Sequence, residues 1–240
     1  MSTEVPPARS DPGTATRVQI LATEHWSLLS HRSLTYTESL ARVNIFLAIL
    51  SGAVVALALI AQVDHFGRTF TVVAIPVLLV VLFTGLGTIS RLTALNRDDY
   101  RWVLGMNRLR HGYLQLYPEL EQYFITGFTD DLPGALRTLG IEPAASRQLG
   151  SVFRHLPNTL PGMLSTIVGA VAAALAALIG QAVGLPFLAV ALLALVGFLV
   201  TLGLLIVRGR RSFRSASPGL EPRFPTDSDQ APAISKERPS

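Results

Sequence analysis

Residues 187–207 read FLAVALLALVGFLVTLGLLIV, and this run of 21 residues decides the fold class. It contains no charged side chain, and Thr201 is its only polar residue. A helix needs about 20 residues, at a rise of about 1.5 Å each, to cross a hydrocarbon core of about 30 Å. A helix of a soluble protein usually keeps a polar stripe along one side. The run therefore predicts a transmembrane helix.

Three further runs have the same character, since each holds 21 or 22 residues and none holds Asp, Glu, Lys, Arg or His. They cover residues 43–63, 70–90 and 162–183. Charged residues make up only 15% of the chain, whereas soluble domains carry about a quarter. The sequence predicts an all-α membrane protein with two transmembrane helical hairpins, 43–90 and 162–207, which gives four spans with cytosolic helical extensions.

The positions of the Lys and Arg residues predict the orientation of the spans. Of the 20, all but Arg68 lie in residues 1–42, 91–161 and 208–240. Positively charged flanks stay in the cytosol during insertion. We therefore expect both termini and the central segment in the cytosol, and a multi-pass protein of the bacterial inner (plasma) membrane.

The segments outside the spans differ in composition. Pro, Ser and small residues predict disorder in residues 1–15, and residues 208–240 read as a basic run followed by a disordered tail. Residues 16–34 are expected to form a cytosolic amphipathic helix. Thr35 and Glu38 fit a capping box, which predicts that a fresh helix begins at Thr35 and continues into the first span.

A heptad seam follows the second span, in the cytosolic helical segment 91–161. It repeats at alternating spacings of three and four residues: Leu92, Leu95, Asp99, Trp102, Met106, Leu109, Tyr113 and Leu116. The second span is expected to continue as one helix to about Tyr117, where Pro118 ends it. The apolar stripe needs a cover, either residues 16–31 of the same chain or a second copy, and the local pairing costs less ordering entropy. We take this seam as the candidate interaction surface.

Shorter features complete the helical prediction. Asp131, placed two residues before Pro133, predicts the start of a short helix that Gly140 ends. An amphipathic helix is expected over residues 149–156. Small residues that suit close helix contacts in lipid recur every four residues: Ala48, Gly52 and Ala56 in the first span, and Ala172, Ala176, Gly180 and Gly184 in the third.

No motif of catalysis or cofactor binding is present in the sequence. The chain lacks a Walker loop, a dinucleotide-binding fingerprint, HExxH and a nucleophile elbow, and it has no cysteine. The five histidines are scattered, so no metal site is expected. The carboxylate pairs Asp98–Asp99 and Asp130–Asp131 are more simply explained by capping or ion pairing. We expect no enzyme activity, no cofactor and no nucleic-acid partner, because no recognition motif accompanies the net charge of +4.

A basic run follows the fourth span and contains Arg208, Arg210, Arg211 and Arg214. We expect it to anchor the span at the cytosolic face. Contacts with anionic lipid heads would contribute about 1 kcal/mol per basic residue. The expected partners are the lipid bilayer and either a second copy of the chain or a cytosolic protein.

Residues 24–29 (EHWSLL) through Ser39, followed by residues 51–57 (SGAVVAL), resemble an uncharacterised family of bacterial four-span integral membrane proteins. The resemblance is strongest over residues 24–57. It implies a bacterial inner-membrane location and brings no catalytic residue with it.

These patterns favour a non-enzymatic inner-membrane protein with a cytosolic helical interaction surface. The alternative is a small oligomeric channel or transporter, and the first candidates to line it are the polar span residues Asn44, Gln62 and Gln181. The spans hold no ionisable side chain, which argues against ion-coupled transport. A membrane enzyme, the third hypothesis, would rely on groups at the cytosolic edge such as His25, Asp98 or Asp99.

Overall fold

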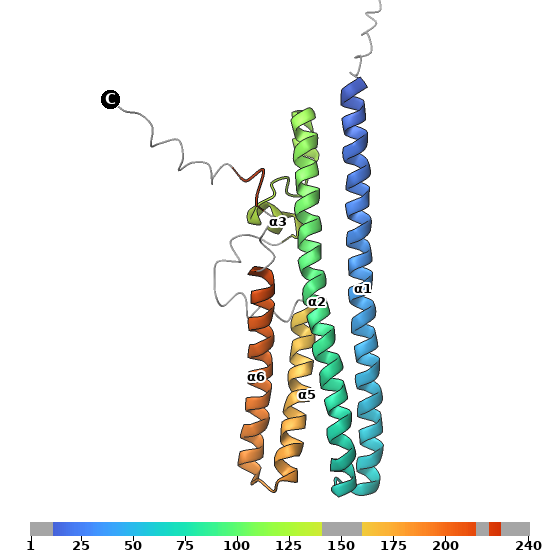
Figure 1. Ribbon diagram of the computed structural model, residues 1–240, viewed down its shortest axis with the longest axis vertical. Coiled ribbons are helices and arrows are strands. Elements are labelled where there is room, and N and C mark those ends of the chain that lie inside the picture. The colour runs from blue at the N-terminus through green and yellow to red at the C-terminus, as the bar shows by residue number, and fades with distance from the viewer. Residues whose placement is uncertain (1–11, 141–159, 215–220, 227–240) are drawn as a thin grey trace, which may run out of the picture. The chain divides into compact units, whose positions relative to one another are not determined.

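The computed structural model describes residues 12–140, 160–214 and 221–226, and every regular element in these residues is helical. Figure 1 shows the elements in order: α1 (Pro12–Asp64), α2 (Arg68–Leu116), the 3₁₀ helix η1 (Pro118–Tyr123), α3 (Leu132–Thr138), α5 (Leu160–Ala182) and α6 (Phe187–Arg214). The chain divides into two compact units. The span unit comprises the described parts of residues 35–98 and 146–218, and the polar unit those of residues 1–34, 99–145 and 219–240.

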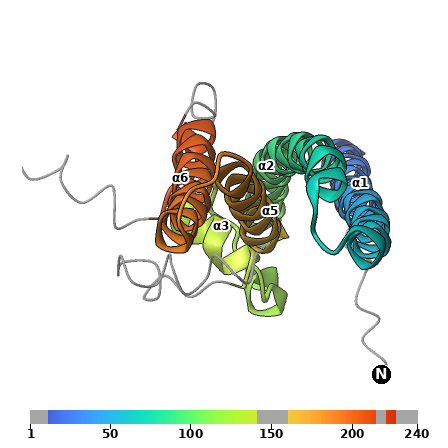
Figure 2. The ribbon, with the colours of Figure 1, turned by 90° about the horizontal axis from the view of Figure 1, so that it is seen from below.

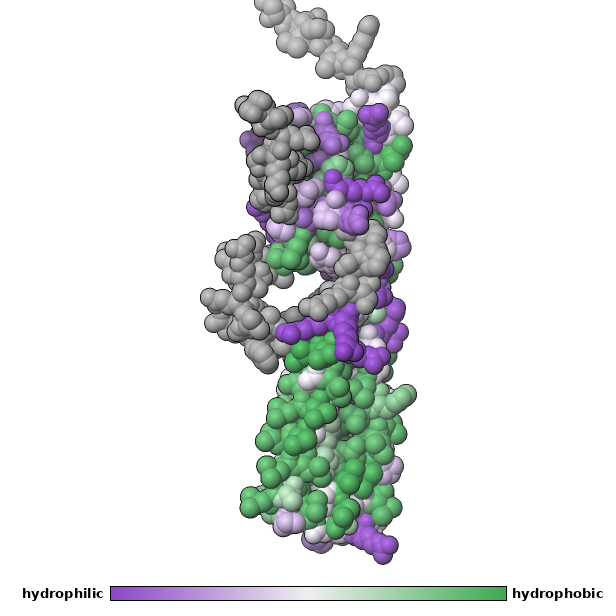
Figure 3. Space-filling view, turned by 60° about the vertical axis from the view of Figure 1, so that its left-hand side comes forward, coloured by the Kyte–Doolittle hydropathy of each residue, from purple (hydrophilic) through white to green (hydrophobic). Residues whose placement is uncertain are grey.

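Four helices, α1, α2, α5 and α6, are long and apolar enough to cross a membrane. This confirms the prediction of an all-helical, multi-pass membrane protein at the level of helix length and composition. The outward side chains of these helices are apolar and exposed, as Phe83 is at 79%, and Figure 3 shows the resulting hydrophobic surface. Such a surface suits hydrocarbon as its solvent.

The span unit packs around α2 and α5, which lie between α1 and α6 (Figure 2). Phe46 of α1, Val81 of α2 and Val168 of α5 are almost fully buried in one apolar cluster. The fit is close at Gly85 of α2, where a Cβ atom would come within 2.6 Å of Val168. Glycine at this position therefore lets α2 approach its two neighbours.

Helices α5 and α6 contact each other along their length through small residues. A Cβ atom at Gly169 would lie 3.1 Å from the Phe198 ring, and one at Gly197 would lie 3.1 Å from the Ala176 Cβ and 3.4 Å from the Ala172 carbonyl. Of the small residues expected in the third span, Ala172, Ala176 and Gly180 thus lie in the contact with α6, whereas Gly184 lies after the end of α5 with open space at its Cβ position. The small residues of the first span do not lie in such a contact, because Gly52 has no atom within 4 Å of its Cβ position.

The prediction that a fresh helix begins at Thr35 is wrong. Helix α1 runs without a break from Pro12 to Asp64, so Thr35 lies in its interior and residues 12–15 are helical rather than disordered. The Glu38 carboxylate accepts from Arg42 Nε at 2.9 Å and from Arg91 Nε at 3.0 Å. Because the helix is continuous through Thr35, no free N-terminal N–H group is left there for Glu38 to cap, and its carboxylate pairs with the two guanidinium groups instead.

The second helix follows the prediction closely, because α2 ends at Leu116 and Pro118 opens the 3₁₀ turn η1. Its start is fixed by Asp64, whose Oδ2 accepts from the Phe70 backbone N–H at 2.7 Å. This is the role of an N-cap carboxylate. The intervening His65 and Phe66 both have positive φ, which closes the turn between α1 and α2.

The polar unit is held by Leu28 of α1, by Val103 and Met106 of α2, and by Ala135 of α3, all buried in one cluster. The short helix α3 forms as predicted, since the Asp131 side chain caps it by accepting from Gly134 N–H at 2.9 Å. Gly140 follows it with a φ of +69°, a conformation that ends helices. The amphipathic helix expected over residues 149–156 lies outside the described residues.

Candidate functional site

The heptad seam of α2 is covered by α1 of the same chain in the polar unit. Leu28 packs against Met106, the His31 ring stacks on Trp102 with centroids 5.2 Å apart, and Arg32 Nε donates to Asp99 Oδ1 at 2.8 Å. The one polar position of the seam thus meets a charged partner.

The other seam residues divide between the two units. Leu109 packs on the buried cluster of the polar unit, Tyr113 stacks on His25 with centroids 6.2 Å apart, and Leu116 is half-buried. Leu92 and Leu95 are buried in the core of the span unit. The seam therefore offers little free surface to another protein.

The His25 ring is poorly placed for acid–base work. Burial lowers the pKa of His25, and the nearby Arg110 charge lowers it further, so the imidazole is neutral at neutral pH. Its stacking partner Tyr113 lies 14 residues along α2 from Asp99, a helix rise of about 21 Å. The structure does not bring His25 and Asp99 together.

A second polar network lies on the side of α2 that faces α3, and it begins at Asn107. This side chain is fully buried, and its Nδ2 donates to the Thr129 carbonyl at 2.8 Å. Its Oδ1 accepts from Arg110 and from the Thr138 hydroxyl, both at 2.8 Å. Asn107 therefore joins α2, the loop before α3 and the end of α3 with all its main hydrogen-bonding groups satisfied.

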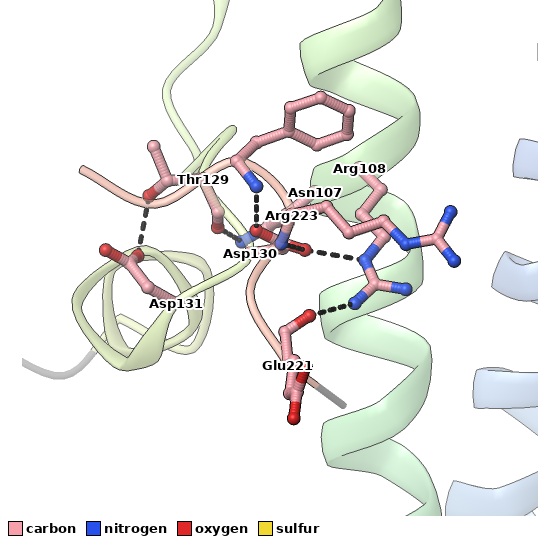
Figure 4. Close-up of polar contacts among 8 residues, drawn as sticks. Asn107, Arg108, Thr129, Asp130, Asp131, Glu221 and Arg223 are labelled. Atoms are coloured by element: carbon pink, nitrogen blue, oxygen red, sulfur yellow. Dashed lines mark hydrogen bonds and ion pairs between the residues drawn. The ribbon is translucent and has the colours of Figure 1, made fainter. Parts of the chain in front are cut away.

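Asp130 is the most buried carboxylate described, at 1% exposure (Figure 4). It accepts from Arg108 Nε at 2.6 Å and from the backbone N–H groups of Arg223 at 2.8 Å and Phe224 at 2.7 Å. Burial by itself would raise the pKa of Asp130, but these three hydrogen bonds and the Arg108 charge outweigh burial, and the pKa is lowered. Asp130 is thus held as a carboxylate.

The Asp131 side chain caps α3 and also accepts hydrogen bonds from Thr226. Its Oδ2 accepts from both the backbone N–H and the hydroxyl of Thr226, at 2.8 Å and 2.7 Å. Burial would raise the pKa of Asp131 as well, but the hydrogen bonds from Thr226, Gly134 and Thr129 together lower it. The expectation of capping or ion pairing for Asp130 and Asp131 is therefore confirmed, but both carboxylates also bind a distant part of the chain.

The distant part is residues 221–226, the C-terminal segment, which lies beside α3 (Figure 1). Arg108 donates to the Glu221 carbonyl at 2.9 Å, and the Phe224 ring stacks on His111 with centroids 4.1 Å apart. The Asp130 N–H donates in turn to the Phe224 carbonyl at 3.2 Å. The prediction of disorder throughout the tail is therefore wrong for these six residues; residues 215–220 and 227–240 lie outside the described part.

We call the side chains that hold this segment the docking site: Arg108, His111, Thr129, Asp130 and Asp131. Their chemistry is that of peptide binding, because two ionised carboxylates accept backbone N–H groups of an extended segment. Each carboxylate already accepts three or more hydrogen bonds, out of about four that it can accept. The arrangement leaves little capacity for a metal ion or for proton transfer.

The remaining candidate residues lie apart from this site. Arg208, Arg210 and Arg211 are on the last turns of α6, where they are at least partly exposed, and Arg214 ends that helix. The three polar span residues Asn44, Gln62 and Gln181 are exposed on α1 and α5, and none of them lines either of the two hollows described below. Within residues 12–140, 160–214 and 221–226, no cluster of His, Asp and Glu is placed to hold a metal ion.

Sequence reasoning missed the docking site because its parts are more than 90 residues apart. One local signal was available, since Phe224 is the single aromatic residue in the Pro- and Ser-rich tail 215–240. An isolated aromatic residue in such a tail indicates a short binding segment.

Comparisons of the chain with family models, with curated proteins and with solved structures gave no match.

Proposed function

We propose that this chain is a non-enzymatic protein of the bacterial inner membrane whose cytosolic helical unit binds a protein partner. The span helices would form two transmembrane hairpins, α1 with α2 and α5 with α6. The extensions of α1 and α2 beyond the bilayer, with α3 and the C-terminal segment, would form the cytosolic part. The partner is either a second copy of the chain or a cytosolic protein.

The observation that carries this proposal is the apolar outer face of α1 in the polar unit. Ile20, Trp26 and Leu34 are 63%, 70% and 66% exposed, and Trp26 and Leu34 lie on the side of the helix turned away from buried Leu28. Tryptophan is among the residues most enriched at the energetic centres of protein interfaces. An exposed apolar face of this kind is typical of a protein–protein interface.

Two of the polar residues between these side chains have hydroxyl groups that are bonded within the helix. The hydroxyl of Thr23 donates to the Gln19 carbonyl and that of Ser30 to the Trp26 carbonyl, both at 2.9 Å along the same helix. Hydroxyl groups bonded in this way to their own helix are partly withdrawn from solvent. Thr23 and Ser30 therefore add less polarity to this face than their sequence suggests.

Lipid is a poor candidate to cover Trp26. Seventeen residues of continuous helix separate it from Val43, where the first apolar run begins, and this corresponds to about 25 Å along the axis. Aromatic residues that anchor spans lie at the membrane–water interface instead. The excess of Lys and Arg in residues 1–42, 91–161 and 208–240 supports a cytosolic position for this part of α1.

Photo-crosslinking in native membranes tests the proposal. A photoreactive amino acid at Trp26 should yield one discrete adduct, and its mass distinguishes a second copy from another protein. The same residue at Gln122, an exposed polar position on η1, is the matched control and should give no discrete adduct.

A second variant makes the test independent of the probe. Replacing both Trp26 and Leu34 by Ser should abolish the interaction while leaving the protein folded, because exposed substitutions usually change stability by about 0.5 kcal/mol or less. Equal, diffuse crosslinking from positions 26 and 122, in membranes that contain the full chain, would overturn the proposal.

A further inference from the structure

A groove of about 410 Å³ opens between α2 and α6 within the span unit. One end of the groove is lined by apolar side chains, chiefly Phe83, Leu86 and Leu205. Its other end is lined by Ser90, Ser212 and Arg208. This volume falls in the range of small-molecule sites in proteins, about 300–1,000 Å³.

The groove lies where two apolar runs end together. Ser90 is the last residue of the run 70–90, and Arg208 directly follows the run 187–207. A molecule that filled the groove would therefore have an apolar part beside the span residues and a polar part beside Arg208. Phospholipids have this division, with acyl chains in the hydrocarbon and a phosphate at its edge.

Charge identifies the kind of phospholipid. Among the residues that the structure describes, Arg208 makes no ion pair and no side-chain hydrogen bond. The nearby Arg91, in contrast, is bonded to the Glu38 carboxylate, at 3.0 Å and 3.2 Å. The groove thus offers one guanidinium group that no acidic side chain neutralises, and the complementary ligand is a lipid with net negative charge.

A second hollow in the span unit has apolar walls alone, and comparison with it shows what distinguishes the groove. It measures about 300 Å³, lies between α1 and α2, and is lined only by apolar residues such as Ile49, Pro76 and Val80. Any acyl chain fits such a hollow, and no charge selects the head that it carries. The groove between α2 and α6 is the one of these two hollows that has a polar end.

We propose that the groove between α2 and α6 is a binding site for one anionic phospholipid, with an acyl chain against Phe83, Leu86 and Leu205 and its phosphate on Arg208. The inference rests on a membrane location for the span unit, and it requires no protein partner. The Ser90 and Ser212 hydroxyls supply further hydrogen bonds to the phosphate.

Two glycines of the lining permit a direct test. A Cβ atom at Gly87 or at Gly209 would meet no atom within 4 Å, so a leucine at either position fills the groove without a clash. Gly203 on α6 also has open space around it but does not line the groove, and Gly203→Leu is the matched control. Arg210→Gln is the matched control for Arg208→Gln, because Arg210 is exposed outside the groove.

The experiment is native mass spectrometry of the full chain, released from micelles with phosphatidylglycerol or with phosphatidylcholine of the same acyl chains. The unmodified protein should retain one phosphatidylglycerol, with a preference of about fivefold over phosphatidylcholine, the factor expected for one basic residue. Gly87→Leu and Gly209→Leu should lose this bound lipid. Arg208→Gln should bind the two lipids equally.

Several results would overturn the site. One is that phosphatidylglycerol remains bound to Gly87→Leu as it does to Gly203→Leu. Another is that Arg208→Gln and Arg210→Gln lose the preference for phosphatidylglycerol to the same degree, which would indicate only a general attraction of anionic lipid to the basic run. Lipid binding is measured on single chains, so a failure of the partner proposed for α1 leaves this result unchanged.

Discussion

The contact between α5 and α6 and the docking site hold the chain together in opposite ways. Between α5 and α6, Gly169 and Gly197 bring the helices close, and the residues that they meet, Phe198, Ala172 and Ala176, are apolar. In the docking site, Asp130 and Asp131 are almost fully buried and accept seven hydrogen bonds between them. The first contact joins neighbours in sequence, and the second joins segments more than 90 residues apart.

We attribute the difference to the solvent that we propose for each unit, lipid around the span helices and water around the polar unit. Lipid is as apolar as leucine, so burial against lipid gives no driving force and close packing has to supply the attraction. In water, a bound peptide segment has to exchange its hydrogen bonds with water for equally good ones, and ionised carboxylates provide them. Substitutions that damage one kind of contact should therefore leave the other intact.

The largest effect is expected for Asp130→Ala in the docking site. This change leaves Arg108 and the N–H groups of residues 223 and 224 without their acceptor, and breaking a buried pair of this kind costs about 3–4 kcal/mol. Trp26 and Trp102 are the only tryptophans and both lie in the polar unit, so their fluorescence reports its unfolding in urea.

Glu221→Gln is the control for this prediction. Glu221 contributes its backbone carbonyl to Arg108, and that carbonyl is kept in the variant. An unchanged urea midpoint for Asp130→Ala would mean that the C-terminal segment does not stabilise the polar unit.

A smaller effect is expected for Gly197→Leu in the contact between α5 and α6. The added side chain has to displace the Ala172 backbone or Ala176, and overpacking of this kind costs about 2 kcal/mol. Unfolding in mixed micelles of increasing SDS content measures it, with Gly203→Leu as the control in open space. The tryptophan signals of the polar unit should stay as they are; a joint loss of both units would refute the separation drawn above.

The sequence predicted the span unit more completely than the polar unit. Four runs of 21 or 22 residues without charge give the span helices directly, and the spacing of Ala172, Ala176 and Gly180 indicates the contact with α6. These signals are local and periodic. The outward position of Gly52 shows their limit, because the same spacing in the first span corresponds to no contact within the chain.

The docking site has no periodic signal. Asp131 was predicted as a helix cap from its distance to Pro133, and this is correct. Nothing in residues 127–138 indicates that Thr226 supplies two further donors, because the pairing depends on the fold. The capping box at Thr35 failed because α1 continues through it, and Glu38 bonds instead to Arg91, which is 53 residues away.

Acid should weaken the docking site more than the contact between α5 and α6. The pKa values of Asp130 and Asp131 are both lowered from 3.8, so their contribution is fully present above about pH 4 and is lost as the pH falls through the lowered values. Urea unfolding followed by tryptophan fluorescence should therefore show falling stability below about pH 4. The fall should be shallower in Asp130→Ala, and parallel pH profiles for the two proteins would contradict the assignment.

The smallest effect is expected for Arg32→Gln, which removes the ion pair with Asp99. Both side chains are about one-third exposed, and pairs of this kind contribute about 0.5 kcal/mol. A second effect opposes this loss of stability. Burial lowers the pKa of Arg110, and the Arg32 charge lowers it further, so Arg32→Gln relieves a repulsion between the two guanidinium groups. We expect a change of about 0.5 kcal/mol or less in the tryptophan-monitored unfolding of the polar unit. Arg42→Gln, whose ion pair lies in the span unit, is the control and should leave this unfolding unchanged. A loss as large as that of Asp130→Ala would show that the pairing of α1 with α2, and not the docked C-terminal segment, is the main source of stability in the polar unit.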